Sequence, residues 1–531
     1  MKSISKTVSL LSLCLAFACK PSESSTDQTA QVNTKPKPNI IYILADDLGY
    51  GDLGAFGSTK IETPNLDALA KNGMRFTQHY SGAPVCAPAR YMLMTGQHAG
   101  HAYIRGNDEW RERDSPSGGD VWNFEDMEND STLEGQRPLP DGTVLFPKRL
   151  QSVGYTTGSV GKWGLGAPQT NSIPNKMGFD FFYGYNCQRQ AHTYYPVHLY
   201  KNENRVPLRN KLVAPSTKLP AGADPSKSES YAGFNQVDYA PDLMFAEMVN
   251  FISENKEKPF YFYWATPIPH VALQAPQRWV DYYEKKFDPE EPYTGNKGYF
   301  PHKNPRAAYA AMVSYLDENV GKLIEHLKKE GLYENTLIIF TSDNGPTFNG
   351  GTDSEWFNSA GPFTEDPAKI KGHVYEGGIR VPMIASWPGK IAPGTSSDLI
   401  SSHIDMMATF AEMTGFEVPE NDGISILPTL TGKEGQKQHE YLYWEFPESG
   451  GQVAIRFGDW KLIRQHLKDK ETPTLELYNL KIDPLETTNV AEANPEILAQ
   501  AEAIFKQAHQ PSELEKFRIP LLEKGLLSME K

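Results

Sequence analysis

Two pairs of oxygen-bearing side chains in this 531-residue chain could bind a metal ion. Asp46 and Asp47 follow the apolar run 39–45, and Asp343 and Asn344 follow the apolar run 336–341. Both runs have the length and composition of a buried strand. A single acidic pair after a strand is most often a turn or a cap. Two such pairs, with oxygen ligands only, favour a hard cation, Ca²⁺ first and Mg²⁺ second.

A cysteine with a suggestive spacing is the second chemical feature. Cys86 lies in the stretch 84–96, PVCAPARYMLMTG, with Pro88 and Arg90 two and four residues after it. Taken alone, Cys86 would be read as a buried cysteine before a helix. A helix that begins there would also point its first backbone N–H groups at a bound anion.

The stretch 84–96 resembles the signature of the type I sulfatases, members of the alkaline-phosphatase-like superfamily. The resemblance implies that Cys86 is oxidised to formylglycine (3-oxoalanine) by a maturation enzyme that recognises Pro88 and Arg90. The hydrated aldehyde would be the nucleophile: one hydroxyl attacks sulfur with S–O cleavage, and the other later expels sulfate.

The same resemblance implies roles for further residues, in the order that the family has them. Asp46, Asp47, Asp343 and Asn344 would bind Ca²⁺ together with the modified Cys86, and Arg90 would hold these groups in place. The remaining predicted catalytic residues are two lysines that contact sulfate, Lys162 and Lys371, and a histidine that faces the leaving-group oxygen, His270. Such groups stabilise the charge that develops in the reaction.

The chain departs from the family at one position. The usual Gly-Lys-x-His reads Gly161-Lys162-Trp163-Gly164 here, so the histidine that normally contacts the formylglycine is missing. Some bacterial carbohydrate sulfatases are similar in this respect. His373 and His192 are the candidates to replace it, and the sequence leaves the choice open.

Two loops supply candidates for binding a sugar, namely 97–107 and 186–195. They combine amides, cations, histidines and aromatic rings, although each residue could equally have a structural role. The predicted substrate-binding residues are Arg105, Gln188, Arg189, His192 and His373.

The elements that must position these residues alternate between strands and helices. This alternation predicts an α/β fold: a large, mostly parallel sheet flanked by helices, with the site at the carboxyl ends of its strands. Beyond residue 432 the pattern predicts a smaller antiparallel sheet plus a helix. The expected strands are 39–45, 155–161, 259–266, 336–341, 454–463 and 476–480, and the expected helices are 63–73, 306–330 and 495–508.

The amino terminus has the pattern of an export signal. Residues 1–18 combine early lysines with the apolar run 8–18, and the run ends at Cys19 in a loose lipobox. We expect a lipoprotein anchored at Cys19 in the periplasm or outer membrane, the alternative being an ordinary cleaved signal peptide. A polar tether over 19–38, a catalytic domain over 39–432 and a C-terminal subdomain over 433–531 would follow. Cys187 would be a buried thiol.

Composition narrows the function classes. The net charge of -14 argues against nucleic-acid binding. The sequence therefore predicts a sulfuric ester hydrolase acting on a sulfated sugar or oligosaccharide, attached to the membrane only through the N-terminal lipid. The alternatives are a phosphodiesterase or phosphonate hydrolase of the same superfamily and a catalytically inactive sugar-binding lipoprotein.

Overall fold

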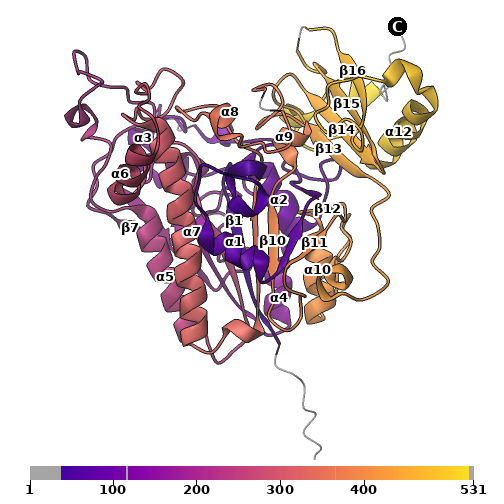
Figure 1. Cartoon of the computed structure of the whole chain (residues 1–531), viewed down its shortest axis with the longest axis horizontal. Coiled ribbons are helices and arrows are strands. Elements are labelled where there is room, and N and C mark those ends of the chain that lie inside the picture. Colours follow the sequence, from indigo (N-terminus) through magenta and orange to yellow (C-terminus); the bar gives the residue numbers. More distant parts are fainter. Residues whose placement is uncertain (1–36, 115–117, 365, 470, 525–531) are drawn as a thin grey trace, which may run out of the picture. The chain divides into compact units, whose positions relative to one another are not determined.

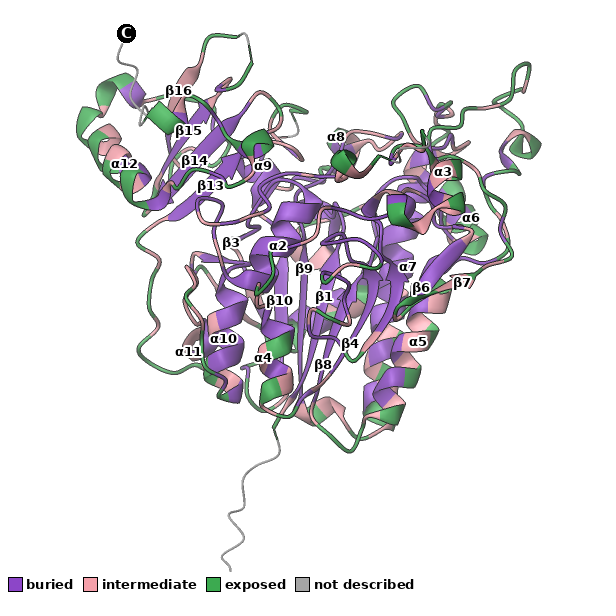
Figure 2. Ribbon diagram, turned by 180° about the vertical axis from the view of Figure 1, so that it is seen from behind, coloured by how far each residue is buried: buried purple, intermediate pink, exposed green. Residues whose placement is uncertain are grey.

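A ten-stranded sheet forms the centre of the protein, seen in a computed structural model that describes residues 37–114, 118–364, 366–469 and 471–524 (Figure 1). β1 (Asn39–Ala45) lies between β9 (Thr336–Ser342) and β8 (Phe260–Ala265) and runs parallel to both. β4 (Thr156–Lys162) lies parallel to β8 on its other side. Every residue of β1, β8 and β9 is buried, which Figure 2 shows as the purple centre of the sheet.

The outer strands complete the order β11-β2-β10-β9-β1-β8-β4-β5-β6-β7. β5 continues the parallel pairing, whereas β10, β6 and β7 pair antiparallel with their neighbours. The predicted large, mostly parallel α/β sheet is thus confirmed. The bounds are β2 (Met74–Phe76), β5 (Phe181–Tyr185), β6 (His198–Lys201), β7 (Asn204–Pro207), β10 (Met383–Ser386) and β11 (Thr395–Ser397). A separate pair joins β3 (His79–Tyr80) to β12 (Ser401–Ser402).

Successive β1 side chains point to opposite sides of the sheet. Since they are buried on both sides, helices cover both faces of the sheet. Tyr42 belongs to one apolar cluster, with residues of α2 (Cys86–Thr95), α4 (Phe146–Ser152) and α10 (Asp405–Thr414). Ile41 belongs to the other, with residues of α1, α5, α6 and α7. These four helices are α1 (Pro64–Lys71), α5 (Ala240–Glu254), α6 (Gln277–Lys286) and α7 (Pro305–Lys329).

Short helices lie in the connecting segments, and a second sheet lies near the carboxyl end of the chain. This sheet has the order β13-β14-β15-β16, all antiparallel, and the predicted C-terminal helix is present as α12. The bounds are β13 (Leu442–Phe446), β14 (Gln452–Phe457), β15 (Trp460–Gln465), β16 (Thr474–Asn479) and α12 (Pro495–Ala508). The short helices are α3 (Phe124–Asn129), α8 (Ser354–Phe357), α9 (Glu376–Ile379) and α11 (Leu427–Thr431).

Residues Lys37–Lys531 form one compact unit, to which the four-stranded sheet belongs. The predicted signal peptide and nearly all of the predicted tether fall within 1–36, outside the described residues. Among the residues that the structure describes, no helix is both long and apolar enough to cross a membrane. Cys187 is buried and not disulfide-bonded, as the sequence predicts.

Candidate active site

The carboxyl ends of neighbouring strands bring the acidic residues together. Asp46 and Asp47 follow β1 directly, and Asp343 follows β9. The Asp343 N–H donates to the carbonyl of Ala45 at 2.9 Å, and the Asp47 N–H donates to Asp343 Oδ1 at 3.1 Å. All three aspartates are buried. Parallel pairing of β1 with β9 therefore joins groups that lie almost 300 residues apart in the sequence.

Cys86 is the first residue of α2 and reaches this acidic group. Its Sγ lies 3.2 Å from Asp46 Oδ1, 3.9 Å from Asp47 Oδ1 and 3.8 Å from Lys371 Nζ. Burial raises the pKa of the Cys86 thiol well above its ordinary value, and the Asp343 and Asp46 carboxylates raise it further. A thiol that stays protonated is a weak nucleophile. The encoded cysteine is therefore poorly suited to act as a thiolate.

Arg90, one turn further along α2, connects three strand ends. Its Nε and Nη2 donate to Asp343 Oδ2 at 3.2 and 2.9 Å, and Nη2 also donates to Asp46 Oδ2 at 3.2 Å. Its Nη1 donates to the carbonyl of Lys162 at 2.7 Å. Burial opposes the charge, but Asp343 and Asp46 outweigh it and raise the pKa of Arg90 above its ordinary value. The planar guanidinium thus fixes two carboxylates and the end of β4 at once.

Two lysines balance the remaining charge. Lys162 Nζ lies 2.6 Å from Asp46 Oδ2, and Lys371 Nζ lies 2.6 Å from Asp47 Oδ2. Burial alone would lower the pKa of each lysine, but the paired aspartate raises it above the ordinary value. With Arg90 and the third aspartate, three cations face three carboxyl groups in a buried cluster, in which each charge depends on its partner.

Asn344 adds an oxygen that lacks a hydrogen-bond donor. Its Nδ2 donates to Asp47 Oδ1 at 2.8 Å, whereas its buried Oδ1 accepts no hydrogen bond from the part of the chain that the structure describes. Burial, followed by the Asp46 charge, raises the pKa of Asp343 to about 6. An acceptor without a donor, among crowded carboxyl groups, fits a hard cation. Asp46, Asp47, Asp343 and Asn344 would hold it.

His270 lies on the other side of Asp47, in the loop that follows β8. Its Nδ1 contacts the carbonyl of Val271, which can only accept, so Nδ1 carries the proton and Nε2 faces Asp47 Oδ2 at 3.7 Å. Burial, with the charge of Lys371, lowers the pKa of His270 well below its ordinary value. The His192 ring stacks on it with centroids 5.0 Å apart, and Tyr299 meets both rings edge-on. The free imidazole is therefore neutral.

The space beside Gly164 is occupied by Gln188, not by either candidate histidine. Gly164 has φ +73°, and a Cβ built on it would lie 3.2 Å from Gln188 Oε1. His192 is held in its stack on His270, and His373 contacts Gln452 Nε2 at 3.3 Å. Each of the two rings thus has a contact of its own, and the replacement of the missing histidine by either of them stays a prediction.

Arg105, a predicted substrate-binding residue, makes its contacts inside the protein. It is buried, and its donors are used within the protein: Nε on the carbonyl of Ala102, Nη1 on Glu445 Oε1 and Nη2 on the carbonyls of Gly100 and Gln510, all at 2.8–2.9 Å. Four of its five N–H donors are used in this way, and Arg105 fastens the 97–107 loop to β13.

Arg189 is also committed to contacts within the protein. Its Nη1 donates to the carbonyl of Val121 at 3.1 Å, and its guanidinium lies 4.2 Å above the Trp122 ring and 5.2 Å from the Phe124 ring. Arg189 thereby joins the loop before α3 to the 3₁₀ helix η5 (Gln188–His192). Its contact with substrate stays a prediction.

Two residues at the site were not predicted. Asn107 accepts hydrogen bonds from the Ala87 N–H at 3.4 Å and from Gln188 Nε2 at 3.1 Å. It ends one of the loops singled out for sugar binding, so its position in sequence was a usable signal. Tyr299, packed against His192 and His270, comes from a segment with no motif and could not have been found.

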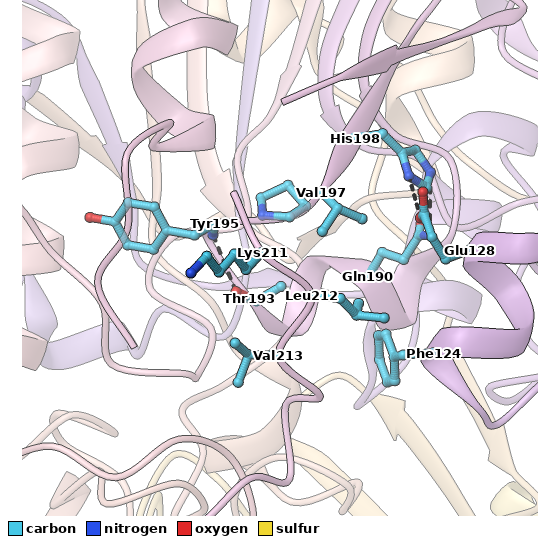
Figure 3. A pocket seen from close by; sticks show the side chains of 11 residues that line it. Phe124, Glu128, Gln190, Thr193, Tyr195, Val197, His198, Lys211, Leu212 and Val213 are labelled. Carbon is cyan, nitrogen blue, oxygen red and sulfur yellow. Dashed lines mark hydrogen bonds and ion pairs between the residues drawn. The ribbon is translucent and has the colours of Figure 1, made fainter. Parts of the chain in front are cut away.

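A pocket at a different place, shown in Figure 3, shares no residue with this cluster. Its polar wall is formed by His198, which lies 2.8 Å from both Glu128 and Glu134. His198 thus faces two carboxylates in this pocket.

The sequence matches known families over most of its length. The family model described as Sulfatase matches residues 38–416, and that of the N-sulphoglucosamine sulphohydrolase C-terminal region matches 370–511. The chain is 27% identical to the N-acetylgalactosamine-6-O-sulfatase of Bacteroides thetaiotaomicron, over 95% of this chain and 99% of that protein. It is 30% identical to human arylsulfatase A, over 87% and 85% of the two chains.

Solved structures also match this chain over most of its length. The structure of Ps i-CgsB superposes with a TM-score of 0.68 at 29% identity, covering 89% of this chain and 94% of that one, and it has also been solved in complex with k-i-k-neocarrahexaose. The phosphonate monoester hydrolase of Agrobacterium radiobacter shares the fold with a TM-score of 0.59 at 20% identity, covering 88% of this chain and 95% of that one.

Proposed function

The chain belongs to the sulfatase family and is a sulfuric ester hydrolase, and we propose that it removes sulfate from a sulfated sugar or oligosaccharide. The observation that carries the proposal is the position of Cys86 at the start of α2, in contact with Asp46 and close to Lys371. This places the residue between the acidic cluster and a cation that could bind the ester.

Cys86 is converted to formylglycine in this proposal. The hydrate would supply two hydroxyls on one carbon, one to attack sulfur and one to expel sulfate afterwards. The raised pKa of the unmodified thiol supports this, because a protonated Cys86 would be a poor nucleophile at neutral pH. Its burial against Asp46 also leaves the new oxygen beside the carboxylates that would hold a cation.

A calcium ion fits the charge balance of the cluster. Without it, Lys162 and Lys371 pair with Asp46 and Asp47. A divalent cation on the carboxylates and on Asn344 Oδ1 would lower the pKa of a bound hydroxyl. It would also take over the neutralisation of the aspartates, and the two ammonium groups would then be free to bind the oxygens of a sulfate ester.

His270 would assist the leaving group. Its Nε2 faces the cluster and its Nδ1 is held by the backbone, so the ring orientation is fixed. A negatively charged ester bound beside it would raise the pKa that burial and Lys371 now depress. The imidazole could then donate a proton to the oxygen that leaves as the sugar hydroxyl.

The sugar itself is inferred from relatives. N-acetylgalactosamine-6-O-sulfatase is named for a sulfated hexosamine, and Ps i-CgsB has been solved with a carrageenan oligosaccharide. We therefore expect activity on a 6-sulfated hexosamine or on a sulfated galactan fragment, and a panel containing both would decide between them.

The decisive experiment is production with a formylglycine-generating maturation enzyme, followed by mass spectrometry of the peptide containing residue 86. We expect an aldehyde at this position and release of sulfate from the panel. Cys86→Ala should abolish release, whereas the matched control Cys187→Ala should retain it. Unmodified Cys86 in an active enzyme, or turnover by Cys86→Ala, would overturn the proposal.

The rival phosphoester activity can be measured in the same assay. Sulfate and phosphate esters of one aryl alcohol differ only in the transferred group, so their kcat/KM ratio isolates the preference. We expect the sulfate ester to be favoured. A preference for the phosphate mono- or diester would instead favour the hydrolase related to the phosphonate monoester enzyme.

Export and lipid anchoring at Cys19 are further proposals, since residues 1–36 lie outside the described part. They are supported by the apolar run 8–18 and the polar segment that follows it. Metabolic labelling with a fatty acid, compared between the wild type and Cys19→Ser, tests them. A wild type that takes up no more label than the variant would contradict the anchor.

A further inference from the structure

A buried amide, which Asn107 links to the residue after Cys86, has an acceptor oxygen with no donor among the described residues. Gln188 is 5% exposed. Its Oε1 is buried and receives no hydrogen bond from any of the residues 37–114, 118–364, 366–469 and 471–524. Leaving a buried acceptor unpaired destabilises the folded protein. A donor that is absent from the encoded chain would remove this destabilisation.

The position of this amide is fixed from several sides. Gln188 Nε2 donates to Asn107 Oδ1 at 3.1 Å, and the same oxygen accepts from the Ala87 N–H, directly after Cys86, at 3.4 Å. The Gln188 N–H donates to Gln136 Oε1 at 3.0 Å. The side chain therefore lies between the first turn of α2 and Gly164 and cannot turn away without breaking these contacts.

Gly164 leaves room for this arrangement. A Cβ there would approach Gln188 Oε1 to 3.2 Å, which is closer than most Cβ contacts. The positive φ of +73° also disfavours any other residue at this position. Gln188 therefore occupies the space into which a side chain at position 164 would project, and the glycine makes room for it.

We propose that Asn107 and Gln188 form an amide pair that positions the oxygen nucleophile carried by residue 86, with Gln188 Oε1 accepting a hydrogen bond from its second hydroxyl. This inference rests on the proposed formylglycine chemistry and names the group that orients it. Asn107 fixes the Gln188 amide to the first turn of α2, and Gln188 orients the hydroxyl that does not attack sulfur.

An amide beside position 164 can be distinguished by experiment from the histidine that the family usually has there. An amide oxygen accepts a hydrogen bond but takes up no proton at neutral pH. The pair therefore fixes a geometry without acting as a base, and the proton of that hydroxyl leaves to water when the carbonyl forms again and sulfate departs. Release of sulfate, rather than attack on the ester, is the step that should respond to a change at Gln188.

The test compares Gln188→Leu, Gln188→Glu and Asn107→Ala with wild-type enzyme, all with residue 86 converted. We expect Gln188→Leu and Asn107→Ala to lower kcat about tenfold or more, since the hydrogen bond to the hydroxyl is lost in the first variant and misplaced in the second. KM should fall together with kcat, so that kcat/KM stays within about threefold of the wild type, because only the step after attack is slowed. Rapid mixing with an aryl sulfate should show a burst of phenol ahead of sulfate. Gln188→Glu keeps an acceptor and adds a base but loses the donor to Asn107, so its kcat should exceed that of Gln188→Leu at a pH above the carboxyl pKa and stay below that of the wild type.

The control is Gln190→Leu, in the same 3₁₀ helix and similarly buried, whose amide donates to Glu134 instead. The inference fails if Gln188→Leu and Asn107→Ala keep kcat within twofold, or if their loss matches that of Gln190→Leu and shows no burst. Failure of the proposed function looks different, because the converted wild type itself would then release no sulfate.

Discussion

Arg90 donates two hydrogen bonds to a single carboxylate oxygen of Asp343, from Nε at 3.2 Å and from Nη2 at 2.9 Å. This contact joins the helix that begins with Cys86 to the strand end that carries two of the five predicted metal ligands, Asp343 and Asn344. A lysine offers a point charge and cannot reproduce a planar set of donors directed at several acceptors.

Arg90→Lys is therefore expected to damage both stability and activity. Breaking a buried charge pair costs about 3–5 kcal/mol, so the melting temperature should fall and kcat/KM should drop by more than a hundredfold. Arg278→Lys, at an exposed pair with Glu318, is the control and should change neither. Wild-type kcat/KM in Arg90→Lys would contradict the positioning role.

Calcium should stabilise the folded protein through Asn344. At a Ca²⁺ concentration of a hundred times Kd the gain is about 2.7 kcal/mol, measurable as a rise in melting temperature after chelation and readdition. Asn344→Leu removes the oxygen that lacks a donor and should shift the Ca²⁺ titration to higher concentration. Asn250→Leu, at an exposed position of α5, is the control. A melting temperature that changes neither on chelation nor on addition of Ca²⁺ would argue against the metal site.

His270 should matter most for poor leaving groups. A sugar hydroxyl needs a proton as it departs, whereas an activated nitrophenolate does not. We expect His270→Ala to lower kcat/KM by about 10²–10⁴ on a sugar sulfate and far less on nitrophenyl sulfate. His326→Ala, a histidine of α7 that contacts Ser253, should leave the turnover of both substrates unaffected. Equal losses of kcat/KM on the two substrates in His270→Ala would count against a proton donor.

Asp317 should make stability fall between pH 4 and pH 6. Burial raises its pKa from 3.8 to about 6 in the folded protein, although it accepts bonds from the Leu66 and Asn65 N–H groups at the start of α1. Folded Asp317 therefore holds its proton where the unfolded chain has lost it, and a rising pH costs the folded state about 3 kcal/mol across this window.

The measurement is the free energy of unfolding in urea from pH 3.5 to pH 7. Asp317→Asn should show a shallower decline over the pH 4–6 window than the wild type, whereas Asp281→Asn, at an exposed position of α6, should follow the wild type. An identical slope in Asp317→Asn would show that this carboxyl titrates normally.

Much of the fold could be predicted because apolar runs and helix signals are local. Strand 39–45 and helix 495–508 have the predicted bounds, and parallel pairing explains why Asp46 and Asp343 meet. Arg105 shows the limit of such reasoning. A polar loop residue that binds substrate and one that holds the loop look alike in sequence, and only the contacts with Glu445 and Gln510 distinguish them.

Residues near the nucleophile show the same limit. Gln188 and Gly164 are more than twenty residues apart, and nothing in either segment indicates that one side chain fills the space of the other. The conversion of Cys86 was inferred from resemblance, because no rule of packing or charge identifies an oxidised residue.

The contacts of Arg105 also bear on how this enzyme could be re-engineered. Its guanidinium ties the loop that ends at Asn107 to Glu445 of β13 and to the backbone of Gln510, beyond α12. The backbone N–H of Asn107 is itself bound by Glu448, just after β13, at 2.6 Å. The four-stranded sheet is therefore not an exchangeable module. Replacing this sheet by that of a relative with a different specificity would shift the 97–107 loop, which ends at Asn107 in the active site. The sheet and this loop must therefore be varied together.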